Sequence, residues 1–132
     1  MLSILIPCFD YNAYPLVCEI EKQAVILKIK FEIICIDDAS FSLKNENNQK
    51  INSIPNAKFI ESKKNIGRIR NRMLLAKTAQ FDWLIFIDVD TTPRNKDFLK
   101  NYIAYKNKGA FVFGGRQFDE KSKIKGGSLR YK

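Results

Sequence analysis

Residues 81–93 read FDWLIFIDVDTTP, and this stretch decides how the rest of the chain is interpreted. Five of the six residues from Trp83 to Asp88 are apolar, and the run then opens onto two aspartates, Asp88 and Asp90. A short, continuously apolar run is typical of a strand buried on both faces of a parallel sheet. The stretch therefore predicts an interior strand that delivers two carboxylates to a site at its end.

Similar runs recur along the chain and alternate with longer amphipathic stretches. The other strands are expected at 2–7, 31–37, 57–61 and 109–115, and helices at 14–29, 68–80 and 95–107. On the helix at 68–80 we expect Ile69, Met73, Leu75 and Ala76 to face inward. The polar segment 40–56 indicates a loop, or a loop with a short helix. This order predicts an α/β fold, an open, mostly parallel, twisted sheet with helices on both faces.

The composition limits the class of protein. A chain of 132 residues makes one domain, and 45% hydrophobic with 28% charged residues indicates a globular protein. No apolar run is long enough to cross a bilayer. The three cysteines have no metal-site spacing and predict free thiols, which fits a reducing cytoplasm. A net charge of +9 indicates a polyanionic partner: nucleotide phosphates, nucleic acid, or an anionic membrane surface such as the inner face of the cell membrane.

The chain contains no histidine, which excludes Ser-His-Asp and Cys-His catalysis and any His-ligated metal. A metal would need oxygen ligands, so Mn²⁺ or Mg²⁺ is expected before Zn²⁺. In an extended strand Asp88 and Asp90 point the same way, and a divalent ion that also binds a diphosphate would relieve their repulsion. The alternative is structural: Asp90 caps the next turn, and Asp88 accepts backbone N–H groups.

Two further motifs follow expected strands, and ligands bind open α/β sheets at the carboxyl ends of the strands. Asp37 and Asp38 form either a local turn or an acceptor for a nucleobase or ribose. The motif NIGRIRNR, residues 65–72, crowds three arginines at a helix start, where cations oppose the helix dipole unless an anion compensates. We therefore expect at least one of these arginines, Arg70 before the others, to contact a phosphate. The alternative is a basic helix face that is merely solvated.

Taken in order, SILIPCFDYN, IICIDDAS, NIGRIRN and WLIFIDVD resemble the nucleotide-binding half of a family 2 glycosyltransferase with the GT-A fold, over residues 2–118. The resemblance implies a nucleotide-sugar donor, a UDP-sugar first, with Mn²⁺ or Mg²⁺ and inversion at the anomeric carbon. It further implies the roles of individual residues: Pro7 and Phe9 line the base pocket, Asp38 bonds the uracil or ribose, Arg70 approaches the base or diphosphate, Asp88 contacts the ribose, and Asp90 coordinates the metal. The link from Gly67 to Arg70 is shorter than the family's.

The resemblance also divides the chain into a nucleotide-sugar-binding domain at 1–118 and a basic tail at 119–132. It places the catalytic base downstream of Lys132, in an acceptor-binding half, and Asp119 and Glu120 are interpreted as surface residues of a turn. We thus expect donor binding without transfer to the glycan or lipid-linked acceptor of cell-envelope polysaccharide synthesis. One alternative, a nucleic-acid-binding module, is opposed by the acidic crevice and the lack of a known motif. A sugar nucleotidyltransferase is opposed by the lack of a Gly-rich, lysine-bearing loop after the first strand.

Overall fold

A computed structural model describes residues 1–109, 112 and 114. Its elements, in chain order, are β1 (Leu2–Cys8), α1 (Tyr14–Ile26), β2 (Phe31–Asp37), α2 (Asn45–Asn48), the 3₁₀ helix η1 (Gln49–Ser53), β3 (Ala57–Glu61), α3 (Arg68–Thr78), β4 (Leu84–Phe86) and α4 (Phe98–Ala104). Strands and helices alternate as predicted.

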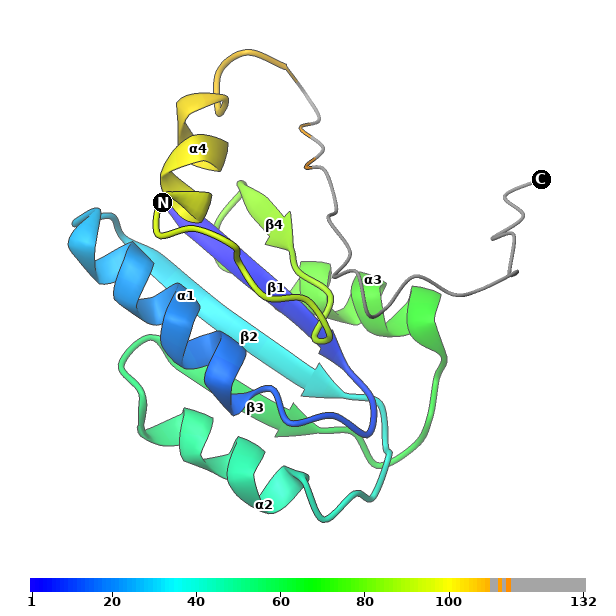
Figure 1. Ribbon diagram of the computed structural model, residues 1–132. Coiled ribbons are helices and arrows are strands. Elements are labelled where there is room, and N and C mark those ends of the chain that lie inside the picture. Colours follow the sequence, from blue (N-terminus) through cyan, green and yellow to red (C-terminus); the bar gives the residue numbers. More distant parts are fainter. Residues whose placement is uncertain (110–111, 113, 115–132) are drawn as a thin grey trace, which may run out of the picture.

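The four described strands form one parallel sheet in the order β3-β2-β1-β4 (Figure 1). Leu5 of β1 lies in register with Ile34 of β2 on one side and with Phe86 of β4 on the other. The chain builds outward from β1 to β3 and then crosses to the opposite side of β1. The switch point is therefore the edge between the carboxyl ends of β1 and β4, where open α/β sheets bind ligands.

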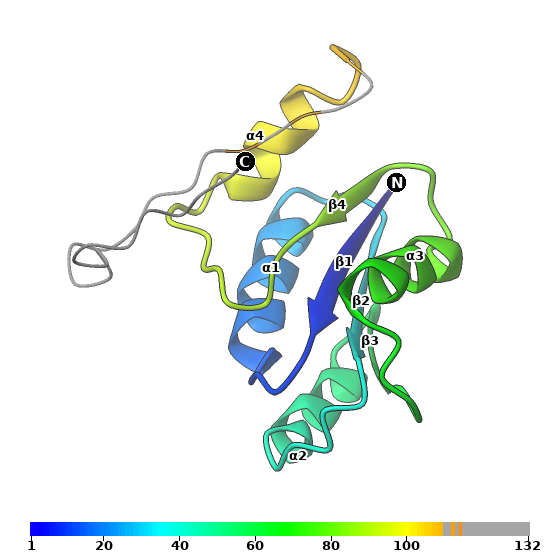
Figure 2. The same ribbon diagram turned by 90° about the vertical axis from the view of Figure 1, so that its right-hand side faces the viewer.

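Each strand sends alternate side chains to the two faces of the sheet, and each face has its own core. Ile4 and Ile6 pack in a cluster with Val17 and Ile20 of α1 and with Leu99 of α4. On the opposite face, a smaller cluster of Leu5, Ile34, Ile36 and Leu75 holds α3. Figure 2 shows α1 and α4 on one side of β1 and α3 on the other. The predicted fold class is confirmed.

Several boundaries differ from the sequence-based prediction. The first helix ends at Ile26, because Lys28 adopts a left-handed backbone (φ 52°) that a helix cannot continue. The other two predicted helices are also shorter, and the segment 40–56 contains α2 and η1, so the second of its two interpretations is correct. Most of the predicted fifth strand, 109–115, and the whole tail 119–132, with Asp119 and Glu120, lie outside the described residues.

The inner face of α3 was predicted correctly only in part. Leu75 is buried as expected and Ala76 is half-buried, but Ile69 and Met73 are 76% and 54% exposed, and Asn71 is buried against the sheet instead. Asn71 takes the inner position because its side-chain amide donates to the carbonyl of Ile36 at the end of β2. A specific hydrogen bond has thus overridden the apolar pattern.

In the described part of the chain, no helix has the length and apolar character needed to span a bilayer.

Candidate functional site

The chain turns sharply after β4. The backbone N–H and the hydroxyl of Thr91 both donate to the carbonyl of Asp88, at 3.0 and 2.6 Å. Residues 88–91 are thus a turn, and the strand ends at Phe86 rather than at Asp88. The extended-strand argument that points Asp88 and Asp90 the same way does not hold here, because the alternation of side chains applies only within an extended strand.

Pro7 accounts for the early end of the pairing between β1 and β4. Ser3 donates its N–H to Trp83, and Leu5 accepts from Ile87, so the odd-numbered residues of β1 face β4. Pro7 is the next residue of that series, and it has no N–H to donate. The ladder ends there, which leaves the chain around Asp88 free to turn away from β1 at the switch point.

Asp88 is held by two arginines of α3. The Arg72 guanidinium contacts one carboxylate oxygen directly, and that of Arg68 lies 3.6 Å from the other. The Arg72 guanidinium also lies over the Phe86 ring, 5.3 Å from its centre. The Asp88 side chain is only 16% exposed. We call Arg68, Arg72 and Asp88 the arginine clamp. The sequence suggested the basic helix start but not this partner. The residue spacing indicates only that Arg68 and Arg72 share one helix face, since they are four residues apart.

The adjacent aspartates at the end of β2 serve different elements, because alternation sends them to opposite faces of the sheet. Both carboxylate oxygens of Asp38 accept backbone N–H groups just before α3, one from Ile66 and one from Gly67, each at 2.8 Å. Gly67 begins the helix with φ +85°, a conformation that a residue with a side chain rarely adopts. Asp38 thus fixes the turn that aims α3, and Asp37 faces the other way.

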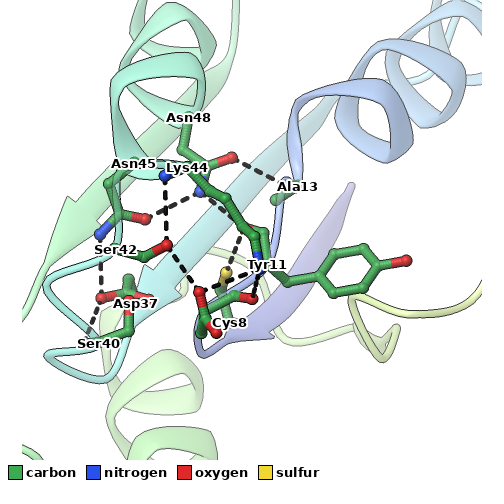
Figure 3. A network of polar contacts seen from close by, with 10 residues as sticks. Cys8, Tyr11, Ala13, Asp37, Ser40, Ser42, Lys44, Asn45 and Asn48 are labelled. Carbon is green, nitrogen blue, oxygen red and sulfur yellow. Dashed lines mark hydrogen bonds and ion pairs between the residues drawn. The ribbon is translucent and has the colours of Figure 1, made fainter.

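Asp37 belongs to a buried polar network that joins the loops after β1 and β2 (Figure 3). Its carboxylate accepts from the backbone N–H of Ser40 and from the side-chain amide of Asn45. Asn48, fully buried, accepts from the N–H of Ala13 and donates to Tyr11 and Asn45. The turn interpretation of Asp37 is correct. Asn45 and Asn48 were missed, although their spacing of three residues in a polar segment was a usable signal.

A second, exposed contact joins the same two loops. The carboxylate of Asp10 accepts from the hydroxyl of Ser42 at 2.7 Å and from the ammonium of Lys44 at 3.1 Å. The bond from Ser42, followed by that from Lys44, lowers the pKa of Asp10. Asp10 and Phe41 both have positive φ, at 48° and 51°. Backbone of this kind is concentrated at functional sites in proteins.

A pocket of about 390 Å³ lies at the switch point on the α1 side. Tyr11, Asn12 and Lys44 line it from the first two loops, and Val89, Thr91 and Thr92 line it from the turn after β4. Figure 3 shows the Tyr11 ring pointing away from the buried network, and this ring forms part of the pocket wall. An aromatic ring beside hydroxyl and amide groups suits a sugar, which presents both apolar faces and hydroxyl groups.

The predicted site residues surround the switch point but do not all face it. Pro7, Asp38 and Asp88 lie at the ends of three neighbouring strands, and Phe9 follows with its ring 57% exposed. Arg70 is exposed, and it lies about 200° around α3 from Arg68, on the opposite face from the arginine clamp. Asp90 is exposed on the turn and, among the described residues, makes no hydrogen bond or ion pair.

The part of the chain at 1–109 contains no group of three or more acidic or cysteine side chains that could enclose a metal ion. Asp88 already has its charge matched by two guanidinium groups. Of the two aspartates predicted for a metal site, Asp90 is thus the one whose carboxylate would be available to an ion. This donor set fits an ion such as Mg²⁺, which keeps several waters and takes one or two carboxylates together with substrate phosphates.

The buried thiols lie next to the site but are protected. The Cys8 side chain and burial raise the pKa of Cys35 well above its ordinary value. Cys8 donates to the carbonyl of Tyr11 from a buried position. A thiol is nucleophilic and metal-binding only as the thiolate, so Cys35 is a packing residue.

Comparisons with known proteins agree with this geometry. The sequence model of the family described as Glycosyl transferase family 2 matches residues 3–129. A search of curated proteins gave no match. Among solved structures, residues 1–349 of TarS from S. aureus, in complex with UDP-GlcNAc, superpose with a TM-score of 0.61 at 22% identity, covering 81% of this chain and 31% of that one.

Two further solved structures are similar. The longer TarS structure has a TM-score of 0.60 at 22% identity, covering 81% of this chain and 19% of its own. The mannosyltransferase PcManGT from Pyrobaculum calidifontis, in complex with GDP-Man and Mn²⁺, has a TM-score of 0.60 at 16% identity, with coverages of 77% and 31%. The chain thus spans at most about a third of the length of these three structures. At such identities the likeness shows the fold, which is GT-A.

Proposed function

The chain belongs to glycosyl transferase family 2, and on this premise we propose that residues 1–109 form the donor site of a sugar transferase. The observation that carries the proposal is the arginine clamp at the switch point, where Asp88 follows β4 and meets two arginines of α3, with a pocket of about 390 Å³ on the other, α1 side. The donor is a nucleotide-diphosphate sugar, a UDP-sugar in the first instance, and the product keeps the sugar with inverted configuration.

The nucleoside is assigned to the ends of β1 and β2. The exposed ring of Phe9, following Pro7, offers a surface against which a base can stack. Each Asp38 oxygen accepts one backbone N–H and keeps a second lone pair for a base N–H or a ribose hydroxyl. Asp88 is assigned to the ribose. Arg70 stays a prediction for the phosphates, although its outward position on α3 makes that contact the least direct.

Asp90 is proposed to hold Mn²⁺ or Mg²⁺ together with the donor phosphates. Bound there, the ion would neutralise the charge that develops on the leaving diphosphate. Asp90 suits the role because its carboxylate is exposed and uncommitted within the described part of the chain. The acceptor, a glycan or lipid-linked hydroxyl, and the base that deprotonates it are proposed for the whole protein. The cytoplasm is the proposed compartment, consistent with the free thiols among the described residues.

A thermal melt tests the donor site. A ligand that binds only the folded state must raise its stability. We expect UDP with Mn²⁺ to raise the melting temperature by more than the sum of the shifts from each alone, and GDP to be a weaker second ligand. Asp90→Asn should keep the melting temperature without ligand and lose the joint increment. The absence of any shift at millimolar UDP and Mn²⁺ would refute the proposal, and an unfolded Asp90→Asn variant would make Asp90 a structural cap.

A further inference from the structure

The arginine clamp places two positive charges on one face of α3 against one negative charge from Asp88. Arg68 and Arg72 are four residues apart on α3, where two like charges repel. The first turn of α3 carries no acidic residue. Asp88, from the turn after β4, is the acid that balances them, and it reaches both guanidinium groups. One carboxylate therefore serves two cations, which leaves the cluster with an excess positive charge at the switch point.

From this arrangement we propose that Arg68 and Arg72 bind the diphosphate of the donor. In the free protein Asp88 is their counter-ion, and the diphosphate replaces it when the donor binds. The inference rests on the proposed donor site and assigns the phosphate contact to residues other than Arg70. A diphosphate carries more charge than one carboxylate and presents oxygens to both guanidinium groups at once.

The positions of the two arginines suit this exchange. The Arg68 side chain is 74% exposed, and Arg72 is 28% exposed beside the Phe86 ring. A guanidinium has five N–H donors, so each arginine keeps donors to spare while it contacts Asp88. Arg72 is the less exposed of the two and lies over the Phe86 ring, so Arg72 is expected to make the better-defined phosphate contact.

The exchange also explains how Asp88 can meet the ribose. In the structure one of its oxygens accepts from Arg72, the other forms an ion pair with Arg68, and the carboxylate is mostly buried. When the diphosphate takes up the arginines, Asp88 regains acceptor capacity at the point where the nucleoside joins the phosphates. A ribose hydroxyl is a donor that fits this position. The Asp88 carboxylate thus contacts the two arginines before the donor binds and the ribose afterwards.

Isothermal titration of the full chain with three probes, UDP, uridine and inorganic pyrophosphate, tests the inference. We expect Arg72→Gln to weaken UDP binding about 10-fold to 100-fold and Arg68→Gln about 3-fold to 10-fold, since bonds to charged groups are worth more than neutral ones. Uridine, which lacks phosphates, should bind all variants alike. The matched control is Lys77→Gln, on the same helix and exposed, which should change UDP affinity less than about 2-fold, and Arg70→Gln tests the competing assignment of the phosphates.

Asp88→Asn gives a sharper test, because the inference predicts tighter rather than weaker binding for this variant. Without its counter-ion the arginine pair is released, so metal-free pyrophosphate should bind this variant several-fold more tightly than the wild type. Weaker pyrophosphate binding by Asp88→Asn, or a loss of UDP affinity confined to Arg70→Gln, would overturn the inference. The pyrophosphate titration needs no nucleoside site, so it still decides the inference if UDP fails to bind. Failure of UDP to bind the wild type would refute the proposed function instead. Because the Arg68 side chain is exposed, Arg68→Gln should fold normally. It therefore tests the inference even if Arg72→Gln misfolds.

Discussion

The loops after β1 and β2 are joined by buried amide groups, whereas the turn after β4 is joined to α3 by ion pairs close to solvent. Hydrogen bonds among Asp37, Asn45 and Asn48 have short-range, directional geometry, and any partner removed leaves another unsatisfied. Ion pairs with partly exposed arginines are weaker, are screened by salt and are exchanged more easily. The difference indicates a division of labour: the first side fixes the shape of the crevice, and the second side responds to a charged ligand.

Removal of Asn48 should have the largest effect on stability. Its truncation in Asn48→Ala leaves the buried N–H of Ala13 and the buried side-chain oxygen of Asn45 without partners, and leaves the carbonyl of Tyr11 with only the weak thiol donor of Cys8. Unsatisfied buried groups cost about 1–3 kcal/mol each, so we expect a loss of about 3 kcal/mol in the free energy of unfolding. Urea denaturation measures it. The neighbouring Asn47→Ala, at an exposed position, is the control and should stay within about 0.5 kcal/mol. Similar losses for both variants would show that the network does not fix the loops.

Asp38 follows β2 and bonds the turn before α3, so it joins the two sides. Its substitution should have an intermediate effect on the free energy of unfolding. Asp38→Asn retains one acceptor for the backbone N–H groups of Ile66 and Gly67 and presents an NH₂ group to the other. We expect a loss of about 1.5 kcal/mol in urea, with weaker UDP binding in the fraction that folds. Asp82→Asn, exposed, is the matched carboxylate control. Lost stability with unchanged UDP affinity would reduce Asp38 to a structural residue of the turn before α3.

The arginine clamp should contribute less than either. Arg72→Gln is expected to lower the free energy of unfolding by about 0.5–1 kcal/mol at low ionic strength, because Arg68 still neutralises Asp88. The difference should shrink in about 1 M NaCl, where charges are screened within a few ångströms. The loss from Asn48→Ala should not change with salt. Equal salt dependence of the two variants would contradict the contrast between the two sides.

The sequence was sufficient for the fold and for the order of the four described strands, but not for every strand end or for the partners of individual side chains. Apolar runs report burial directly, so the strands, their parallel arrangement and the aspartates at their exits could be predicted. Whether Asp88 meets a metal, a backbone N–H or Arg72 depends on how α3 is placed, which is a long-range property. The same limit produced the error on α3, where the inward position of Asn71 depends on the carbonyl of Ile36, 35 residues away.

Some of the site was still recoverable. A spacing of four residues places Arg68 and Arg72 on one helix face and puts Arg70 on the opposite side, so helical geometry alone separates them. The strand period of two likewise sends Asp37 and Asp38 to opposite faces of the sheet. These two rules assign the two aspartates and the three arginines to a side of the sheet or helix from residue spacing alone. The turn at 88–91 follows neither rule, because the strand ends two residues before it begins.

The smallest effect is expected at Asp10, whose exposed bonds to Ser42 and Lys44 lower its pKa from the ordinary 3.8. A pKa lowered in the folded state means that the charged form stabilises the fold. This contribution is complete above the ordinary pKa and is lost as the pH falls through the lower, folded value. The difference in melting temperature between the wild type and Asp10→Asn should therefore be constant above about pH 5 and vanish in acid. Asparagine tolerates the positive φ of this position as aspartate does, so the substitution isolates the charge. Ser42→Ala should remove part of the same difference, since the Ser42 bond is the larger cause of the shift. A difference that grew toward low pH would mean that Asp10 is destabilising when charged, and the exposed link between the two loops would then have to be reassigned to Lys44 and the Asp10 carbonyl, which lie 2.8 Å apart.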